Sequence, residues 1–358
     1  MTEKINLYTL SKTELTDIII AWGYPKFRAG QVWDWLYTSF ITDITLMTNL
    51  PAPLRERLID EATIGTLTVS AEQSSRDGTT KRLYHLPDGQ LIESVLMPYD
   101  DDRRTACIST QAGCAMGCVF CATGQMGFAR HLTADEIFEQ AARFASLLHA
   151  EGERLSNVVL MGMGEPFHNY DESLKAIHRL MDDLGIGARH ITISTVGLVP
   201  QIRRFADEGL QVRLAISLHA ATNAERGALL PINKKWDLPE LMRACRYYIQ
   251  KTGKRVTFEW ALIKGKTDTA EQAHALGQLL QGMYCHVNAI PLNPTTGYDG
   301  DPSTPNNAQE FTDILESYGV SVTIRVRRGI DIDAGCGQLK SQVMKRNLIS
   351  VDSIIAEE

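Results

Sequence analysis

The sequence predicts an α/β fold with a parallel sheet, open or closed as a barrel, behind a small N-terminal domain. Three observations lead to this expectation. Short apolar runs rich in β-branched residues recur from about residue 104, helical segments separate most of them, and the first 95 residues follow a different pattern. Folds of this class bind their ligands at the carboxyl ends of the strands. The loops that follow the expected strands are therefore the first place to look for a functional site.

Residues 1–95 are expected to form an accessory domain of helices and one β-hairpin. Helical spacing is visible on either side of Pro51-Ala52-Pro53, which separates two helices. Two strand-like segments follow and are joined through Pro87-Asp88-Gly89. Alternating strands connected by such a turn are typical of a hairpin.

Seven strands are expected in the core, which we place between residues 96 and 340. The strands are the runs Ala106–Thr110, Asn157–Met161, Ile191–Thr195, Val212–Leu218, Val256–Ile263, His286–Leu292 and Val320–Val326. The clearest helix spans residues 135–148, where Thr133 and Glu136 make a capping box. Residues 341–358 form a C-terminal tail in which we identify no functional motif.

Composition and the N-terminal segment indicate a soluble protein. The chain of 358 residues is 44% hydrophobic and 22% charged, which is ordinary for a globular protein. No apolar run approaches the roughly 20 residues that cross a bilayer. The first residues contain no apolar signal region. We therefore expect a cytoplasmic location and no contact with membranes.

The overall charge is unfavourable for a nucleic-acid-binding protein, since the formal net charge is −7. The distribution is uneven, because residues 200–266 contain 13 Lys and Arg against 6 Asp and Glu, a local net charge of +7. Such a block can form a phosphate-binding face, or it can be a set of solvated helix faces. Charge alone favours the solvated faces.

The seven cysteines are unevenly distributed, and four of them lie within fifteen residues. An odd number in a chain without an export signal does not indicate a disulfide framework. Cys114, Cys118 and Cys121 have a three-plus-two spacing, which allows three thiolates to bind a [4Fe–4S] cluster and leaves its fourth iron without a protein ligand. That iron can bind the amino and carboxylate groups of S-adenosylmethionine. The alternatives are a structural zinc site with His131 as the fourth ligand, or a group of buried thiols.

Six motifs along the chain narrow the interpretation. They are Gln111–Gly124 (QAGCAMGCVFCATG), Met161–Pro166 (MGMGEP), Ser194–Gly197 (STVG), Ser217–Ala220 (SLHA), Pro291–Pro294 (PLNP) and Cys336–Leu339 (CGQL). In this order they resemble the radical S-adenosylmethionine (radical SAM) superfamily, and within it the RlmN-type adenosine C2 methyltransferases. The resemblance extends from residue 27 to residue 339. It implies a partial (β/α)6 TIM-like radical SAM barrel behind a small N-terminal α+β accessory domain that contacts RNA.

The resemblance also assigns several residues at strand ends to S-adenosylmethionine. These are Gly164, Glu165, Ser194, Ser217, Leu218, His219 and Asn293. The residue types suit this role, because glycine lets backbone carbonyls approach a ligand closely and the polar side chains offer hydrogen-bonding groups. Taken singly, each is equally consistent with a loop cap or a buried polar group. Their recurrence at successive strand ends favours the ligand.

Three further residues are candidates for chemistry on the base. Cys336 lies in a glycine-flanked loop after the last expected strand, where an exposed thiol could hold a methyl group. Cys107 lies in the first expected strand, where a cysteine is most often buried and inert. Glu93 interrupts an apolar strand on the face shared by Leu91 and Val95. A carboxylate there needs a partner or a function unless that face is exposed to solvent.

The resemblance implies a role for each of these residues. Cys336 accepts a methyl group from one S-adenosylmethionine, and the cluster cleaves a second one into methionine and a 5′-deoxyadenosyl radical. That radical removes hydrogen from the S-methyl group, and the methylene radical adds to the base. Glu93 removes the ring proton, and Cys107 attacks the sulfur of Cys336, which leaves a Cys107–Cys336 disulfide. The implied substrates are 23S rRNA and tRNA next to the anticodon, with a flavodoxin or ferredoxin as electron donor and a monomeric enzyme.

Other functions are open at this point. The related Cfr-type C8 methyltransferases use the same cysteines, so the motifs do not separate C2 from C8, and C2 is preferred because it is the housekeeping branch. A non-methylating iron–sulfur redox protein would need neither the strand-end residues nor the pair Cys107 and Cys336. A zinc-dependent RNA-binding module is more distant. Cys245 and Cys285 match no motif and are expected to be structural.

Overall fold

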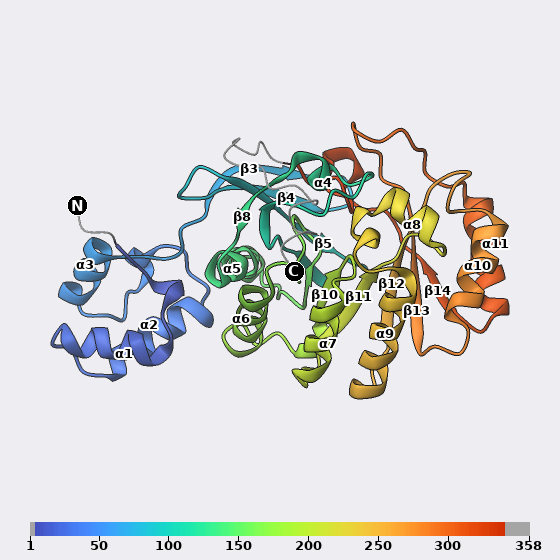
Figure 1. The fold of residues 1–358 in the computed structure, drawn as a ribbon. Helices are drawn as coiled ribbons and strands as arrows, with labels where there is room; N and C mark the ends of the chain where they lie inside the picture. Colours follow the sequence, from blue (N-terminus) through green and yellow to red (C-terminus); the bar gives the residue numbers. More distant parts are fainter. Residues whose placement is uncertain (1–3, 341–358) are drawn as a thin grey trace.

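The computed structural model describes residues 4–340, and its centre is one ten-stranded sheet (Figure 1). The strand order is β14-β13-β12-β11-β10-β9-β6-β5-β4-β3. The neighbours from β6 to β14 are all parallel, and those from β6 to β3 are antiparallel. The expected tail, residues 341–358, lies outside the described residues.

The parallel strands are those expected from the sequence. They are β6 (Arg104–Cys107), β9 (Asn157–Leu160), β10 (Ile191–Thr195), β11 (Arg213–Ser217), β12 (Val256–Leu262), β13 (Cys285–Pro291) and β14 (Ser321–Ile324). The helices among them are α5 (Ala134–Ala150), α6 (Tyr170–Asp182), α7 (Val199–Asp207), α8 (Asn223–Leu229), α9 (Leu238–Thr252), α10 (Ala270–Leu280) and α11 (Pro305–Ser317). The α/β class is confirmed, and the sheet is open, with β14 and β3 at its two edges. Among residues 4–340 no helix combines the length and the apolar character needed to span a membrane.

Helix α5 begins at the expected capping box and is fixed to the segment that follows β6. The N–H of Glu136 donates to Thr133 Oγ1 at 3.3 Å, and the N–H of Thr133 donates to Glu136 Oε2 at 3.0 Å. Farther along the helix, the Gln140 side-chain amide exchanges two hydrogen bonds with the backbone of Ser109, at 2.8 and 2.9 Å. The chain that leaves Ser109 then forms a short antiparallel pair with α4 between its strands: β7 (Gln111–Gly113), α4 (Ala122–Met126) and β8 (Phe128–His131).

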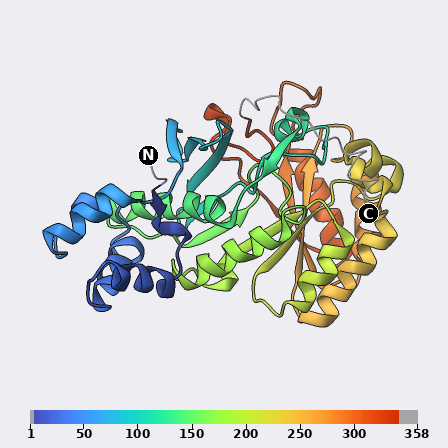
Figure 2. The same cartoon turned by 60° about the vertical axis from the view of Figure 1, so that its left-hand side comes forward.

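The N-terminal helices form a group beside the core, as Figures 1 and 2 show. They are α1 (Lys12–Ala21), α2 (Phe27–Tyr37) and α3 (Ala52–Glu61), with the short parallel pair β1 (Ile5–Asn6) and β2 (Ala62–Thr63). The two helices expected around Pro51 are therefore confirmed as α2 and α3. Side chains of the core bind this group: Arg179 Nη2 donates to Tyr37 Oη at 2.9 Å, and Glu139 Oε2 accepts the N–H of Thr66 at 2.7 Å.

The expected hairpin consists of β4 (Thr80–His85) and β5 (Leu91–Pro98), and β3 (Thr68–Ser74) pairs with β4. Because β5 also pairs with β6, the hairpin extends the sheet of the core rather than forming a sheet of its own. The register places Val95 opposite Cys107. The division of the chain at residue 95 stays a prediction.

Candidate functional site

A cavity of about 230 Å³ lies where the parallel strands end. Its lining comes from segments that are far apart in the sequence. The expected site residues that line it are Cys107, Cys114, Cys118, Cys121, Gly164, Glu165, Ser194, Ser217, His219, Asn293 and Cys336. Glu93 and Leu218 are not among the lining residues. The structure thus gathers all but two of the expected side chains at one place.

The three expected cluster ligands lie on the turn between β7 and α4. The N–H of Cys114 donates to Gly127 O at 2.8 Å, and Cys121 is the residue that caps the N-terminus of α4. The N–H of Cys121 donates to Cys118 O at 3.2 Å, so these two cysteines share a turn. The helix packs closely on that turn, since a Cβ on Gly124 would lie 3.0 Å from the backbone N and O of Cys118. The sequence therefore holds the three thiols in one compact loop.

The donor set fits an iron–sulfur cluster. Cys114, Cys118 and Cys121 are free of disulfides and face the same cavity. Burial raises the pKa of each thiol, so the thiolates need a nearby positive charge, which iron supplies. Among residues 4–340, no three His, Cys, Asp or Glu side chains are grouped so that they could hold a metal ion. The fit therefore rests on the three sulfur donors and their shared cavity.

His131, the alternative fourth ligand of a zinc site, lies elsewhere. Its Nδ1 is 3.0 Å from Gln111 Nε2, and its ring packs against that of His168 with the centroids 4.8 Å apart. It does not line the cavity of the cysteines. The zinc interpretation therefore gains no fourth ligand from this histidine.

Gln111 is a positioning residue to which the sequence motif gave no role. Its Oε1 accepts the N–H of Glu165 at 2.8 Å, and its Nε2 lies 3.0 Å from Nδ1 of both His131 and His168. Gly164 adopts a φ of +104°, and a Cβ there would lie 2.6 Å from Gln111 Cβ. The Gln111 side chain thus fixes the loop after β9 against the strand that leads to Cys114. Its only sequence signal was its place at the head of the cysteine motif.

Glu165 joins two of the strand-end loops. Its carboxylate accepts the N–H of Val196 at 2.8 Å and the N–H of Phe167 at 3.0 Å. Burial raises the pKa of Glu165 to about 7, although these hydrogen bonds oppose the rise. The side chain therefore holds the loops after β9 and β10 together at the wall of the cavity.

His219 presents one hydrogen-bond donor to the cavity. Its Nδ1 accepts the N–H of Ala261 at 3.0 Å, and burial lowers its pKa to about 3, so the ring is neutral with the proton on Nε2. The residue has a positive φ of 59°, which turns it away from the strand direction. Leu218 is fully buried beside it. Its N–H donates to Glu259 O at 3.1 Å, which fixes the backbone next to His219.

Asn293 presents an unused acceptor at the cavity. Its Nδ2 donates to the carbonyl of Cys336 at 3.0 Å, whereas its Oδ1 is buried without a hydrogen-bond partner among the described residues. A buried amide oxygen of this kind is costly unless a ligand satisfies it. The orphan oxygen therefore fits a bound ligand with a hydroxyl or amino group, such as S-adenosylmethionine.

Cys107 and Cys336 line the same cavity although they lie at opposite ends of the core sequence. Cys107 is the last residue of β6 and is buried, whereas Cys336 is exposed. Burial raises the pKa of Cys107, and the charge of Arg325 opposes the rise. The sequence alone favoured a buried and inert cysteine at position 107. In the structure, β6 pairs with β5 and β9, and its last residue, Cys107, lines the cavity.

The loop that carries Cys336 is hydrogen-bonded to the turn between β3 and β4 and to residues 114–123, which we call the cluster loop. At the cluster loop, Gly337 O accepts the N–H of Ala122 at 2.7 Å, and Leu339 O accepts Thr123 Oγ1 at 2.7 Å. At the turn between β3 and β4, Asp77 Oδ2 accepts the N–H of Gly329 at 2.9 Å. The loop is therefore held at both ends while its exposed thiol faces the cavity.

Glu93 lies behind the cavity wall rather than on it. It is 5% exposed, so the alternative of a solvent-exposed face does not apply. Its Oε1 lies 3.2 Å from Lys81 Nζ, and its Oε2 accepts the N–H of Lys340 at 2.8 Å. Burial raises the pKa of Glu93, and the Lys81 charge opposes the rise. Leu339 lines the cavity, so Lys340, the partner of the carboxylate, is the immediate neighbour of a lining residue.

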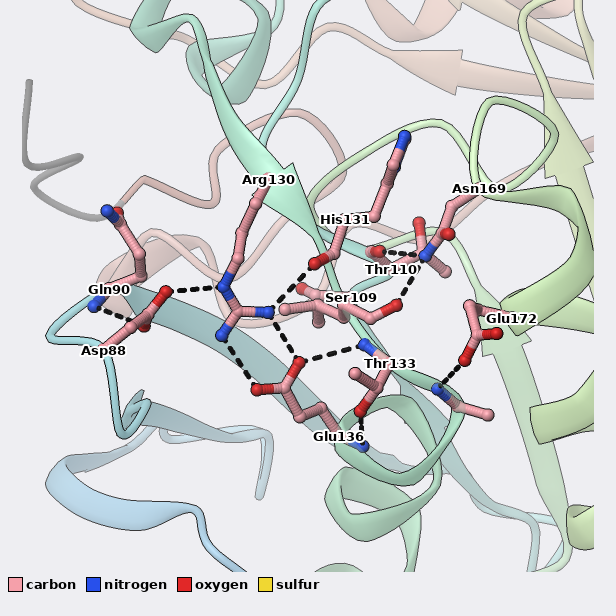
Figure 3. Close-up of polar contacts among 12 residues, drawn as sticks. Asp88, Gln90, Ser109, Thr110, Arg130, His131, Thr133, Glu136, Asn169 and Glu172 are labelled. Atoms are coloured by element: carbon pink, nitrogen blue, oxygen red, sulfur yellow. Dashed lines mark hydrogen bonds and ion pairs between the residues drawn. The ribbon is translucent and has the colours of Figure 1, made fainter. Parts of the chain in front are cut away.

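A polar network fixes β8 to the surrounding elements (Figure 3). Arg130 Nε donates to Asp88 Oδ2 at 2.6 Å in the hairpin turn, and both of its Nη atoms contact the Glu136 carboxylate at 2.7 and 2.8 Å. The neighbouring Asn169 Nδ2 donates to Thr110 O at 2.9 Å. Because β8 pairs with β7, this network supports the strand from which the cysteine loop begins.

Replacing Arg130 with methionine is expected to lower the free energy of unfolding by about 2 kcal/mol, because charge-assisted hydrogen bonds to two carboxylates are lost. Urea denaturation measures the change. Arg103, whose exposed side chain contacts Asp101 at 2.8 Å, is the matched control. Its replacement with methionine is expected to cost less than about 0.5 kcal/mol. Equal losses in the two variants would contradict the role given to the network.

Comparison with known proteins places the chain in a family. Residues 108–276 match the radical SAM superfamily, and residues 5–64 match the "Ribosomal RNA large subunit methyltransferase N-terminal domain". The chain is 54% identical to the "Dual-specificity RNA methyltransferase RlmN 1" of Myxococcus xanthus, over 96% of each chain. It is 47% identical to the "Probable dual-specificity RNA methyltransferase RlmN" of Geobacillus kaustophilus, over 95% of this chain and 93% of that one.

A solved structure agrees with these matches. The crystal structure of a radical SAM methyltransferase from Sphaerobacter thermophilus superposes with a TM-score of 0.89 at 44% identity, covering 94% of this chain and 99% of that chain. The agreement spans both the N-terminal helices and the core that carries the cysteine cavity. The chain therefore belongs to the radical SAM superfamily and, within it, to the RlmN family of dual-specificity RNA methyltransferases.

Proposed function

We propose that this protein methylates carbon C2 of adenosine in 23S rRNA and in tRNA next to the anticodon. The observation that carries the proposal is the meeting of Cys107 and Cys336 with the three cluster cysteines at one cavity. A redox protein needs the cluster alone, whereas a second pair of thiols suits a group that is held, transferred and released. The names of the relatives support RNA as the substrate and two specificities, and the match of residues 5–64 supports large-subunit ribosomal RNA as one of them.

Membership of the radical SAM superfamily implies a [4Fe–4S] cluster and S-adenosylmethionine. We assign the cluster to Cys114, Cys118 and Cys121. Polar groups at the cavity are available for S-adenosylmethionine, namely the Asn293 Oδ1 acceptor and the His219 Nε2 donor, together with Ser194, Ser217 and the backbone around Gly164. Leu218, whose N–H is bonded to Glu259 O, would position its neighbours Ser217 and His219. When bound, these cofactors would supply one methyl group from a first S-adenosylmethionine and, with a second one, a one-electron route to an unreactive C–H bond.

The roles of the two remaining cavity thiols follow from their exposure. Cys336 is exposed at the cavity and carries the methyl group that is passed to the base. Cys107 is buried at the end of β6 and attacks the sulfur of Cys336 once the base is attached. That attack forms the Cys107–Cys336 disulfide, breaks the bond from sulfur to carbon and leaves its electron pair on the carbon, which a proton converts to the methyl group.

We assign to Glu93 the removal of the ring proton from the base adduct, whose remaining unpaired electron would return to the oxidised cluster, and the structure sets a condition for this role. The Lys340 N–H occupies Glu93 Oε2 at 2.8 Å, so the segment that leads from Cys336 to Lys340 has to shift before the carboxylate can reach the base. Lys81, at 3.2 Å, favours the charged form of the carboxylate and opposes the burial that raises its pKa.

Replacing Lys81 with methionine is expected to move the acid limb of the pH–rate profile to higher pH. The Lys81 charge lowers the pKa of Glu93, so its loss raises that pKa, and the base stays protonated up to a higher pH. The methylation rate as a function of pH measures the shift. Lys81→Arg should restore the wild-type profile, and Lys175→Met, which removes an exposed lysine paired with Glu172, should leave it unchanged. An acid limb that does not move in Lys81→Met would contradict the role of Glu93.

The cavity mouth supplies positive charge for phosphate contacts. Arg325, Arg327 and Arg328 line the cavity, and we place RNA contacts there and on the N-terminal helices. The basic stretch of residues 200–266 contributes less than its composition indicated. Arg204 contacts Asp171 at 2.6 Å and Lys251 contacts Asp207 at 3.1 Å, so part of its charge is neutralised within the protein.

The test is an anaerobic reaction of reconstituted protein with reductant, methyl-labelled S-adenosylmethionine and unmodified 23S rRNA or tRNA. We expect label in both RNAs, dependent on the reductant. Reduced flavodoxin or ferredoxin is proposed to replace the chemical reductant, and we propose a cytoplasmic monomer. Cleavage of S-adenosylmethionine without label in either RNA would contradict the proposed substrate class.

A further inference from the structure

Arg226 on α8 is a fully buried cation, and its hydrogen-bond acceptors in the described part of the chain are all neutral. Its exposed fraction is 0%. Nη1 donates to Asn233 Oδ1 at 3.0 Å, and Nη2 donates to the carbonyls of Val196 at 2.5 Å and Ser217 at 3.4 Å. Nε has no hydrogen-bond partner among residues 4–340. The guanidinium is thus held in place without an anion to balance its charge.

A buried charge of this kind is expensive unless an opposite charge compensates it. Burial lowers the pKa of Arg226 only to about 10, so the side chain stays charged at neutral pH. Two part-buried arginines of this chain have carboxylate partners: Arg143 contacts Glu139 at 2.8 Å, and Arg179 contacts Asp135 at 2.8 Å. An anion near Arg226 is therefore expected in the functional protein.

The guanidinium lies directly behind the wall of the cysteine cavity. Its two carbonyl acceptors belong to residues that line the cavity, whereas Arg226 itself is not a lining residue and does not reach the ligand space. The end of α8 contacts the cluster loop, since Leu229 O accepts the N–H of Val119 at 3.1 Å. Val119 is the residue next to Cys118, an expected cluster ligand. Arg226 therefore lies outside the cavity, on the helix that contacts the loop of the expected cluster ligands.

We propose that Arg226 supplies a fixed positive charge that stabilises the reduced form of the [4Fe–4S] cluster. The inference rests on the proposed cluster site at Cys114, Cys118 and Cys121. An oxidised cluster with three thiolates has a net charge of about −1, and one-electron reduction changes it to about −2. Attraction to a fixed cation grows with that added charge, so reduction becomes more favourable.

The test is the midpoint potential of the reconstituted cluster, followed by electron paramagnetic resonance during a redox titration without S-adenosylmethionine. For Arg226→Gln we expect the equilibrium constant for reduction to fall about tenfold, which is about 59 mV towards more negative potential for a one-electron couple. Arg226→Lys keeps the charge and should stay near the wild-type potential. Arg179→Gln, which removes a part-buried arginine outside the cavity, is the matched control and should cause no shift. An unshifted potential in Arg226→Gln would overturn the inference.

Iron and sulfide content separates this inference from the proposed cluster site. A wild-type protein that takes up no cluster would overturn the site, whereas Arg226→Gln with full iron content and an unshifted potential would overturn only the role of Arg226. Thermal unfolding adds a readout that needs no cluster. Without iron, Arg226→Met removes an uncompensated charge and should unfold at a temperature no lower than the wild type, and reconstitution should stabilise it less. A metal-free Arg226→Met protein that is less stable, or does not fold, would show that Arg226 is a structural cap of β10 and β11 and would overturn the proposal.

Discussion

Replacing Cys336 with alanine is expected to lower the rate of RNA methylation below about 10⁻³ of the wild-type rate while leaving the cluster in place. The carbon C2 of adenine is neither acidic nor nucleophilic enough to take a methyl group by displacement, so the methyl group needs a sulfur to hold it first. Cys336 offers the exposed thiol at the cavity, and Asn293 and the cluster loop hold its backbone in place.

Label transfer to RNA and iron content measure the two parts of this expectation separately. Cys285→Ala is the matched control, because Cys285 is a buried thiol at the start of β13 and does not line the cavity. It should keep both activity and iron. Methylation that persists in Cys336→Ala would show that the methyl group reaches the base without this thiol, and the mechanism would be wrong.

Replacing Cys107 with alanine is expected to stop the reaction one step later, with the RNA covalently attached to the protein. In the proposed sequence the base is linked through its new carbon to the sulfur of Cys336, and release needs a second thiol that attacks this sulfur. Cys107 is the other thiol outside the cluster motif that lines the cavity. Its removal therefore leaves the link unbroken.

Denaturing electrophoresis of the reaction mixture detects such an adduct as a protein band that carries labelled RNA. The adduct should be absent in wild type, absent in the double variant Cys107→Ala with Cys336→Ala, and absent in Cys245→Ala, whose thiol is buried outside the cavity. Free methylated RNA at the wild-type rate from Cys107→Ala would show that release proceeds without Cys107.

The fold was predictable to a large extent because its signals are local. The seven parallel strands are short apolar runs, and the capping box at Thr133 marks the start of α5 in sequence as in structure. The pairing of the hairpin with the sheet of the core could not be predicted in the same way. Pairing of β5 with β6 depends on contacts between strands, and alternation along one strand does not reveal its neighbours.

The candidate site was predictable where several residues are close in sequence and less so where they act through distant contacts. The spacing of Cys114, Cys118 and Cys121 in the sequence predicts them as cluster ligands. The sequence does not single out Gln111 or Arg226, because their expected roles depend on the hydrogen bonds that they make to distant loops. The position of Glu93 on an apolar strand left a solvent-exposed face open, and its assignment to the site came from the family resemblance. Its contacts with Lys81 and Lys340 became visible only in three dimensions.

Nucleoside mass spectrometry tests the central claim most directly. RNA from the anaerobic reaction with methyl-labelled S-adenosylmethionine is digested and compared with 2-methyladenosine and 8-methyladenosine standards. The proposed function predicts label in 2-methyladenosine from both 23S rRNA and tRNA. Label in 8-methyladenosine would contradict the C2 position and assign the chain to C8 chemistry at the same thiols. Absence of labelled adenosine, with the cluster intact and S-adenosylmethionine cleaved, would contradict adenosine as the substrate.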